Sequence, residues 1–184
     1  MAHVPKIMNN QQTTVILFRG RPGVGKTTIS NAFATEREIP ILRKDDIYDI
    51  SALYISDHKT RNKISYDSMF KILETNSLFN TQIVLDFPFN KEGEIKNLYD
   101  WCNNHNMRLI SALVICSDRK IWESRFNKRS ENPTPNQLIT NLNELEKHYG
   151  DLNVTSLKDE IVLDTINSTE DILKQLETHI PKFQ

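Results

Sequence analysis

The sequence predicts an α/β fold of three layers, in which a mostly parallel five-stranded sheet is flanked by helices. Two observations lead to this prediction. Short apolar runs alternate with longer amphipathic stretches along the whole chain, which is typical of successive βαβ units. The chain has 184 residues, 38% of them apolar, which suffices for one domain with a substantial core and is short for two. We therefore expect a single domain over residues 1–184.

Short apolar runs are expected to form the strands, and the amphipathic stretches between them the helices. The strands are expected at Thr14 to Arg19, Ile39 to Leu42, Gln82 to Leu85, Arg108 to Ile115 and Glu160 to Leu163. The helices are expected to begin near Lys26, Asp46, Arg61, Lys91, Asp118, Thr134 and Ser168. Pro133 and Pro135 should end the preceding helix, because proline lacks the N–H that a helix interior needs. Thr134 and Pro135 are then expected as the N-cap and first turn of the next helix.

The loop after the first strand fits the phosphate-binding pattern G-x-x-x-x-G-K-[ST]. Its residues are Gly20, Arg21, Pro22, Gly23, Val24, Gly25, Lys26 and Thr27, and Thr28 follows them. A glycine-rich turn lets successive N–H groups point into one concavity, and the next helix directs the positive end of its dipole at the phosphates. Lys26 would neutralise the β- and γ-phosphates, and the Thr27 hydroxyl would bind Mg²⁺, which prefers hard oxygen ligands. The sequence therefore predicts a site for a nucleoside triphosphate with Mg²⁺.

Asp86 stands at the end of the third apolar run. Ligands of open α/β sheets bind at the carboxyl ends of the strands, so an aspartate there is a candidate for the site. Asp86 has the position of a Walker B carboxylate, which would orient Mg²⁺ or its waters beside Thr27. The alternative is that Asp86 only caps a turn before Pro88, since aspartate is common in turns.

Asp45 and Asp46 follow the second expected strand. A carboxylate within hydrogen-bond reach of an attacking hydroxyl can take its proton, a recurring part of phosphoryl transfer. Either aspartate could instead be an N-cap for the helix that runs through Ile47, Ile50 and Tyr54. Two adjacent acids favour one cap and one residue that faces the site, and we choose Asp45 as the candidate base.

The helix expected from Asp118 to Ser130 is basic, and the spacing of Arg125 and Arg129 puts both on one face. Arginine suits the charge on a transferred phosphoryl group, because its planar fork donates bidentately and stays charged. The alternative is a solvated basic face. The proline-rich break after this helix gives a mobile lid a place to bend, so we expect a lid over about residues 118–136.

Composition narrows the classes of partner and compartment. A net charge of -1 gives no global attraction to nucleic acid or to anionic membranes. Cys102 and Cys116 have no metal-ligand or redox spacing, so we expect reduced, buried thiols. The sequence has no run near the roughly 20 apolar residues that a membrane span needs, and its N-terminus lacks the apolar region of a leader. We expect a cytoplasmic protein with no membrane partner.

The assembled motifs resemble those of the P-loop kinases that phosphorylate small molecules or nucleic-acid ends, including chloramphenicol phosphotransferase, gluconate kinase and the 5′-kinase domain of polynucleotide kinase. The resemblance spans nearly the whole chain. It rests on Gly20 to Thr28 as Walker A, Lys44 to Ile47 as the acidic motif, Ile83 to Asp86 as Walker B, Cys116 to Asp118 as the lid entry, Arg125 and Arg129 as the lid arginines, and Val162 to Thr165 as the last strand.

This resemblance implies a three-layer P-loop NTPase fold with a helical lid, ATP as the phosphate donor and a hydroxyl group as the acceptor. It also implies that Asp45 is the base and that Lys26, Arg125 and Arg129 bind the phosphates. Small organic acceptors are favoured, because Ile47, Tyr48 and Asp49 stand where the nucleic-acid kinases have an arginine for the acceptor phosphate.

Three alternatives stay open at this point. Phe87 and Phe89 either line an organic acceptor or belong to the core. A nucleic-acid 5′-end or nucleoside kinase would be favoured by a basic groove that includes Lys59, Arg61 and Lys63. An ATP-binding regulatory switch with little transfer would be favoured by a flat surface, rather than a closed aromatic cavity, beside Asp45.

Overall fold

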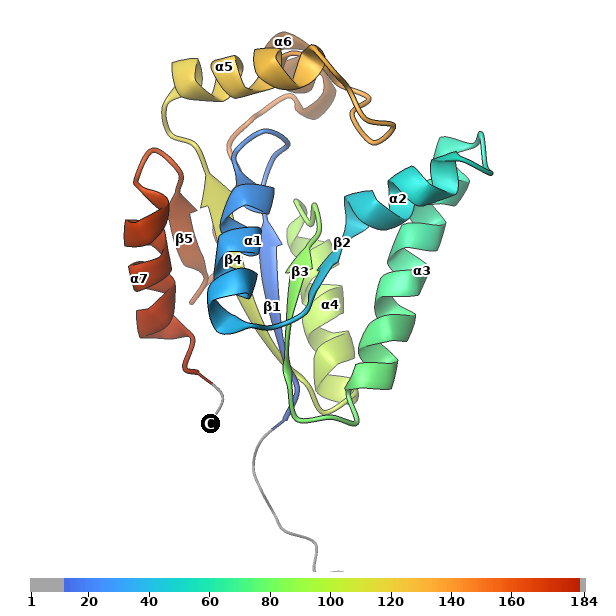
Figure 1. The fold of residues 1–184 in the computed structure, drawn as a ribbon, viewed down its shortest axis with the longest axis vertical. Coiled ribbons are helices and arrows are strands. Elements are labelled where there is room, and N and C mark those ends of the chain that lie inside the picture. Colours follow the sequence, from blue (N-terminus) through green and yellow to red (C-terminus); the bar gives the residue numbers. More distant parts are fainter. Residues whose placement is uncertain (1–11, 183–184) are drawn as a thin grey trace, which may run out of the picture.

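The computed structural model describes residues 12–182, which fold around a sheet of five parallel strands in the order β2-β3-β1-β4-β5 (Figure 1). The strands are β1 (Thr14–Arg19), β2 (Ile41–Arg43), β3 (Gln82–Asp86), β4 (Arg108–Ile115) and β5 (Ile161–Asp164). The helices are α1 (Lys26–Arg37), α2 (Lys44–Ala52), α3 (His58–Asn76), α4 (Glu92–Asn104), α5 (Arg119–Ser130), α6 (Leu142–Tyr149) and α7 (Thr169–His179).

The central strand β1 is buried along its whole length and divides two apolar cores. Its side chains alternate, with Ile16 and Phe18 in one core and Val15 and Leu17 in the other. Buried residues of α1 and α7 complete the first core, and those of α3 and α4 complete the second. The sheet is thus covered by helices on both faces, and the prediction of a three-layer α/β fold is confirmed (Figure 1).

The carboxyl ends of the strands lie at the same end of the sheet, and α5 and α6 lie across that end (Figure 1). The phosphate-binding loop joins β1 to α1 at this end of the sheet, and the neighbouring strand β3 ends there with Asp86. All candidate site residues therefore belong to segments that begin or end on the same side of the molecule.

The prediction of a helix that begins near Thr134 is wrong. Residues 131–141 form turns and loop, and the next helix begins at Leu142, with Asn141 as its N-cap accepting a hydrogen bond from the Glu144 N–H. This segment is held by hydrogen bonds other than those of a helix, because Asn136 donates from its backbone and its side chain to the Asp49 carboxylate on α2. Only the first part of the expected 118–136 lid is therefore helical.

Other boundaries shift by a few residues for local reasons. Helix α3 begins at His58 because the Asp57 side chain accepts from the Thr60 N–H and caps it.

Cys102 and Cys116 are buried free thiols, and burial raises the pKa of Cys102 to about 12. In the described part of the chain, none of the helices combines the length and apolar character needed to cross a bilayer.

Candidate active site

The phosphate-binding loop requires glycine at positions where its backbone turns tightly. Gly20, Gly23 and Gly25 have φ angles of 141°, 80° and 100°, which disfavour other residues. A Cβ on Gly20 would lie 2.2 Å from the Val114 carbonyl oxygen, and one on Gly23 would lie 2.6 Å from the Phe126 ring. The loop is therefore packed between β4 and α5, with its N–H groups free to form a concave anion site.

Thr27 and Asp86 lie together at the start of α1. The Thr27 hydroxyl donates to Asp86 Oδ2 at 2.7 Å, and the Ser30 hydroxyl lies 3.4 Å from the same oxygen. This pairing follows from the sheet, since β1 and β3 are neighbours and Phe18 pairs with Asp86. A hydroxyl and a carboxylate in contact fit a Mg²⁺ ion held mainly by phosphates and water. No group of three or more His, Cys, Asp or Glu side chains within residues 12–182 could hold a metal alone.

Lys26 reaches back over the loop, where Nζ donates to the Arg21 carbonyl oxygen at 3.1 Å. Burial lowers the pKa of Lys26, and the carboxylates of Asp86 and Asp45 act in the opposite direction. Lys26 and Asp45 line the same cavity.

Asp45 and Asp46 point to different surroundings. Asp46 is exposed and pairs with Arg43 at 3.1 Å. Asp45 is half-buried, has no hydrogen bond to another described residue, and lines the same cavity as Lys26. Burial raises the pKa of Asp45, although Lys44 and Lys26 counteract it. The expectation that one of the pair caps α2 is wrong, because the N-cap residue is Arg43, whose side chain makes no capping hydrogen bond to the backbone of the helix.

Helix α5 holds the phosphate-binding loop. Arg125 Nη1 donates to the Val24 carbonyl at 3.2 Å and to the Thr165 hydroxyl at 2.7 Å, and Nη2 donates to the Thr165 carbonyl at 2.9 Å. Trp122 Nε1 donates to the Pro22 carbonyl at 2.9 Å. The sequence did not single out Trp122 or the role of Thr165, since neither belongs to a polar motif.

Arg129 lies one turn beyond Arg125 on the cavity side of α5, as its spacing predicts. It faces the Gln137 side chain, whose oxygen, when turned towards it, accepts from Arg129 Nε at 3.2 Å and Nη2 at 3.0 Å. Lys120 and Lys128 of the same helix are exposed. The solvated-face alternative thus describes Lys120, whereas the exposed Lys128 lines the cavity together with the two half-buried arginines.

The loop after α5 closes the cavity against α2. Asn136 donates from its backbone N to Asp49 Oδ1 at 2.9 Å and from Nδ2 to Asp49 Oδ2 at 2.7 Å. Asp49 lies one helical turn after Asp45, so both carboxylates face the cavity. The i, i+4 spacing of Asp45 and Asp49 was a signal that both carboxylates face the cavity. No signal in the sequence indicated that Asn136 would be the hydrogen-bond partner of Asp49.

Together these segments surround a cavity of about 880 Å³. Its walls include Gly23, Gly25, Lys26, Thr27, Thr28, Asp45, Asp49, Arg125, Arg129, Asn136 and Thr165. The volume is within the range of cofactor sites. The cavity joins the predicted phosphate loop, base and arginines in one space.

Phe87 and Phe89 do not line this cavity. They are 0% and 4% exposed, stack on each other with ring centroids 6.2 Å apart, and both contact the Tyr66 ring. The interpretation of these rings as an acceptor wall is therefore wrong, and they belong to the core. The cavity beside Asp45 is neither the aromatic pocket expected of a kinase nor the flat surface expected of a switch.

The alternative of a basic groove depends on Lys59, Arg61 and Lys63, and two of these cations have local partners. Arg61 lies over the Tyr48 ring, 4.8 Å from its centroid, and donates to the Ser56 carbonyl. Lys63 pairs with Asp67 at 2.8 Å. Two of the three expected cations are thus engaged locally.

Comparison with known proteins supports the same fold. The AAA_33 family, described as an AAA domain, matches residues 15–147. A candidate kinase from Chloroflexus aurantiacus superposes with a TM-score of 0.69 at 19% identity, covering 92% of this chain and 96% of that one. A sugar kinase from Janibacter sp. HTCC2649 gives 0.61 at 16% identity, covering 91% and 93%. The Mycobacterium tuberculosis APS kinase CysC, in complex with AMPPNP and APS, gives 0.61 at 10% identity, covering 91% and 96%.

Comparison with curated proteins finds no match. The matched family region runs from β1 almost to the end of α6 and so contains the phosphate-binding loop, Asp45, Asp86 and α5. The prediction of a P-loop kinase fold is confirmed. Since the match covers well over half of the sequence, the chain belongs to the AAA_33 family.

Proposed function

We propose that this protein transfers the γ-phosphate of Mg–ATP to a hydroxyl of a small organic acceptor, with residues 1–184 acting as one kinase-like domain. The observation that carries the proposal is the position of Asp45. Its carboxylate has no partner among the described residues and lines the same cavity as the phosphate-binding loop and Lys26. A nucleotide-binding switch has no need of a free carboxylate there.

The donor half of the site is the loop from Gly20 to Thr28. Its N–H groups and Lys26 would bind the phosphates, and Thr27 with Asp86 would hold Mg²⁺. When bound, the metal would neutralise charge on the β- and γ-phosphates. The structurally similar APS kinase, which was solved in complex with AMPPNP, supports a nucleotide in this position.

The acceptor half is proposed to work by proton removal and charge neutralisation. Asp45 takes the proton of the acceptor hydroxyl as its oxygen attacks the γ-phosphorus and the bond to the β-phosphate oxygen breaks. Arg129 and Lys26 stabilise the negative charge on the transferred group. Arg125 also stabilises this negative charge from the edge of the cavity, where hydrogen bonds to Val24 and Thr165 fix its guanidinium.

The neighbouring folds include a sugar kinase and an APS kinase, and both names denote transfer to a small molecule. This supports a small acceptor over a nucleic-acid end, as do the local contacts that engage Arg61 and Lys63.

A nucleotide-dependent switch is the second candidate, favoured by the contacts between the phosphate-binding loop and the α5–α6 region. Arg21 stacks on Tyr149, 3.9 Å from the ring centroid, and donates to the Asp151 carbonyl at 2.8 Å. A movement of the loop on phosphate binding would therefore act directly on Tyr149, through Arg21, and on Trp122 of α5, through Pro22.

The test is an ADP-release assay over sugars, gluconate, nucleosides, phenicols, aminoglycosides and 5′-hydroxyl oligonucleotides. We expect one class to stimulate turnover, and Asp45→Asn to abolish that stimulation while a labelled ATP analogue still binds. Asp46→Asn is the matched control, since its side chain is exposed and paired with Arg43. Stimulated turnover that survives Asp45→Asn would refute the proposed base, and no stimulation by any class would favour the switch.

A further inference from the structure

The first half of β4 has a free edge. On one side, β4 pairs with β1 from Arg108 to Leu113. On the other side, its pairing with β5 begins only at Ala112. Residues 108–111 therefore have no strand partner on that side within residues 12–182. Unpaired N–H and C=O groups at a sheet edge form a template for another strand.

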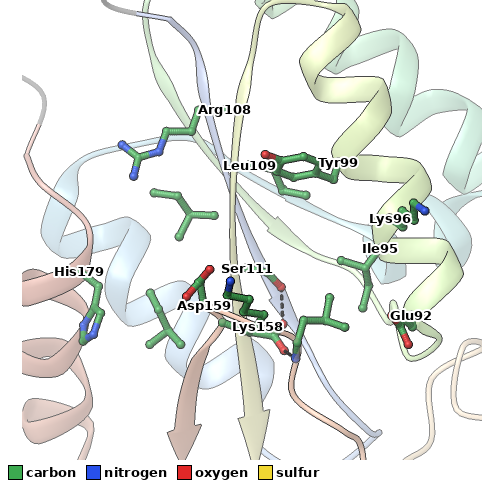
Figure 2. Close-up of a pocket in the computed structure, with 14 residues that line it drawn as sticks. Glu92, Ile95, Lys96, Tyr99, Arg108, Leu109, Ser111, Lys158, Asp159 and His179 are labelled. Atoms are coloured by element: carbon green, nitrogen blue, oxygen red, sulfur yellow. Dashed lines mark hydrogen bonds between the residues drawn. The ribbon is translucent and has the colours of Figure 1, made fainter.

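A cavity of about 580 Å³ lies along this edge (Figure 2). We call it the edge cavity; it is bounded by Arg108 to Ser111 of β4, by Ile95 and Tyr99 of α4, and by His179 of α7. Figure 2 shows the α4 side chains on one side of the strand and His179 on the other. The free edge thus has helices on both faces, as the paired strands do. The position beside residues 108–111, where a further strand would pair with β4, holds no strand of the described residues.

One end of the edge cavity is closed by a rigid turn. Glu160 follows Lys158 and Asp159 in this turn, and its carboxylate accepts from Arg19, the Ser111 hydroxyl and the Leu157 N–H. The Arg19 and Glu160 side chains are each 1% exposed. The turn is therefore fixed to β1 and β4, and the cavity is formed in advance of any ligand.

We propose that the edge cavity binds an extended acidic peptide segment of a partner protein, which adds to the sheet beside residues 108–111 of β4. The length of free edge matches a segment of about four residues, since a strand rises about 3.3 Å per residue. Main-chain hydrogen bonds to β4 supply affinity, and alternate side chains of the peptide enter the cavity or face solvent. The site is separate from the cavity that holds Lys26 and Asp45, and no residue lines both.

Charge selects an acidic partner. Lys96, Arg108 and Lys158 line the edge cavity and make no ion pair among the described residues. Of the acids on the same walls, Glu160 is neutralised by Arg19, which leaves Glu92 and Asp159 against these cations. The excess positive charge favours carboxylates at the rim of the cavity. The chain's own residues 1–11 contain no aspartate or glutamate, so they lack this chemistry.

The wall also has an apolar part, formed by Ile95, Leu109, Leu157 and Ile161. Ile95, Leu109 and Leu157 belong to the core on the α4 side of the sheet, whereas Arg108 lies on the opposite side of the strand from the α4 side chains (Figure 2). An extended peptide that alternates apolar and acidic residues would place its apolar side chains against the first set and its acidic side chains near Arg108. The chemistry expected of the partner is therefore an alternating apolar and acidic strand.

The test is selection of displayed eight-residue random peptides on the full-length protein, with counter-selection on a Lys96→Glu, Arg108→Glu double variant. Both positions are exposed, so the double variant is expected to fold, which far-UV circular dichroism checks. We expect acidic, alternating peptides whose affinity falls at least about tenfold in the double variant and is unchanged in Lys147→Glu, an exposed change on α6.

Two further measurements identify the binding mode without a variant of the protein. A selected peptide should slow amide hydrogen exchange within Leu109 to Ser111, and backbone N-methylation of that peptide should abolish binding. The proposal is overturned if no peptide is enriched over the double variant, if N-methylated peptides bind equally well, or if protection falls outside residues 108–111 and 157–161.

Discussion

The buried Arg19–Glu160 pair allows a stability prediction of calculable size. Glu160→Gln keeps the shape of the side chain but removes its charge, and so leaves the Arg19 guanidinium uncompensated in a site that is 1% exposed. Breaking a buried ion pair from one side costs about 3–5 kcal/mol. The amide of glutamine also cannot accept all the bonds that Arg19, Ser111 and the Leu157 N–H now make. We expect a loss of about 4 kcal/mol in the free energy of unfolding.

Urea unfolding followed by far-UV circular dichroism measures this loss. With a slope of about 2.5 kcal/mol per molar urea, the midpoint should fall by about 1.6 M. The matched control is the double variant Arg19→Met, Glu160→Met, which removes both charges and is expected to lie closer to the wild type than Glu160→Gln. A loss below about 1 kcal/mol for Glu160→Gln, or a double variant that is less stable than the single one, would refute the reasoning.

Three further predictions concern the site. Asp86→Asn should raise the Mg²⁺ concentration needed for half-maximal turnover by about tenfold or more, measured in the ADP-release assay; an unchanged requirement would exclude a metal role. Because burial raises the pKa of Asp45, turnover should fall on the acid side at a higher pH than an ordinary carboxyl would give, and Asp45→Asn should stabilise the fold at neutral pH. That gain in melting temperature should vanish as the pH falls below about 4, where the carboxyl is protonated in both states; a gain that persists there would contradict it. Asp49→Ala removes both bonds to Asn136 and should raise the KM for ATP at least about tenfold, with Asp46→Ala as the control that leaves it unchanged.

The sequence was most informative where local pattern and fold agree. The strands at Thr14–Arg19 and Arg108–Ile115 have the expected bounds, because continuous apolar runs can only be buried between two layers. The helix near Thr134 was misplaced because its proline and threonine signals are local, whereas the Asp49–Asn136 contact that holds this segment joins residues 87 positions apart.

The candidate site divides in the same way. The phosphate-binding loop and Asp86 could be identified because their spacing along the chain reflects geometry within one βα unit and its neighbouring strand. Phe87 and Phe89 were ambiguous, since an aromatic pair after a strand suits a core as well as a ligand. Their contact with Tyr66 of α3, which decides the matter, depends on how a distant helix packs.

Helix geometry separates the surroundings of Asp45 and Asp46, which composition could not do. Successive residues of a helix are turned by about 100°, so two adjacent aspartates cannot share a face, whereas residues four apart do. Asp45 and Asp49 are four apart and both line the cavity. Asp46 is turned away and pairs with Arg43. Because Asp49 is engaged by Asn136, Asp45 is the carboxylate of this helix turn that is free to accept a proton from a bound hydroxyl. The contact that closes the loop over the cavity therefore favours Asp45 over Asp49 as the proposed base.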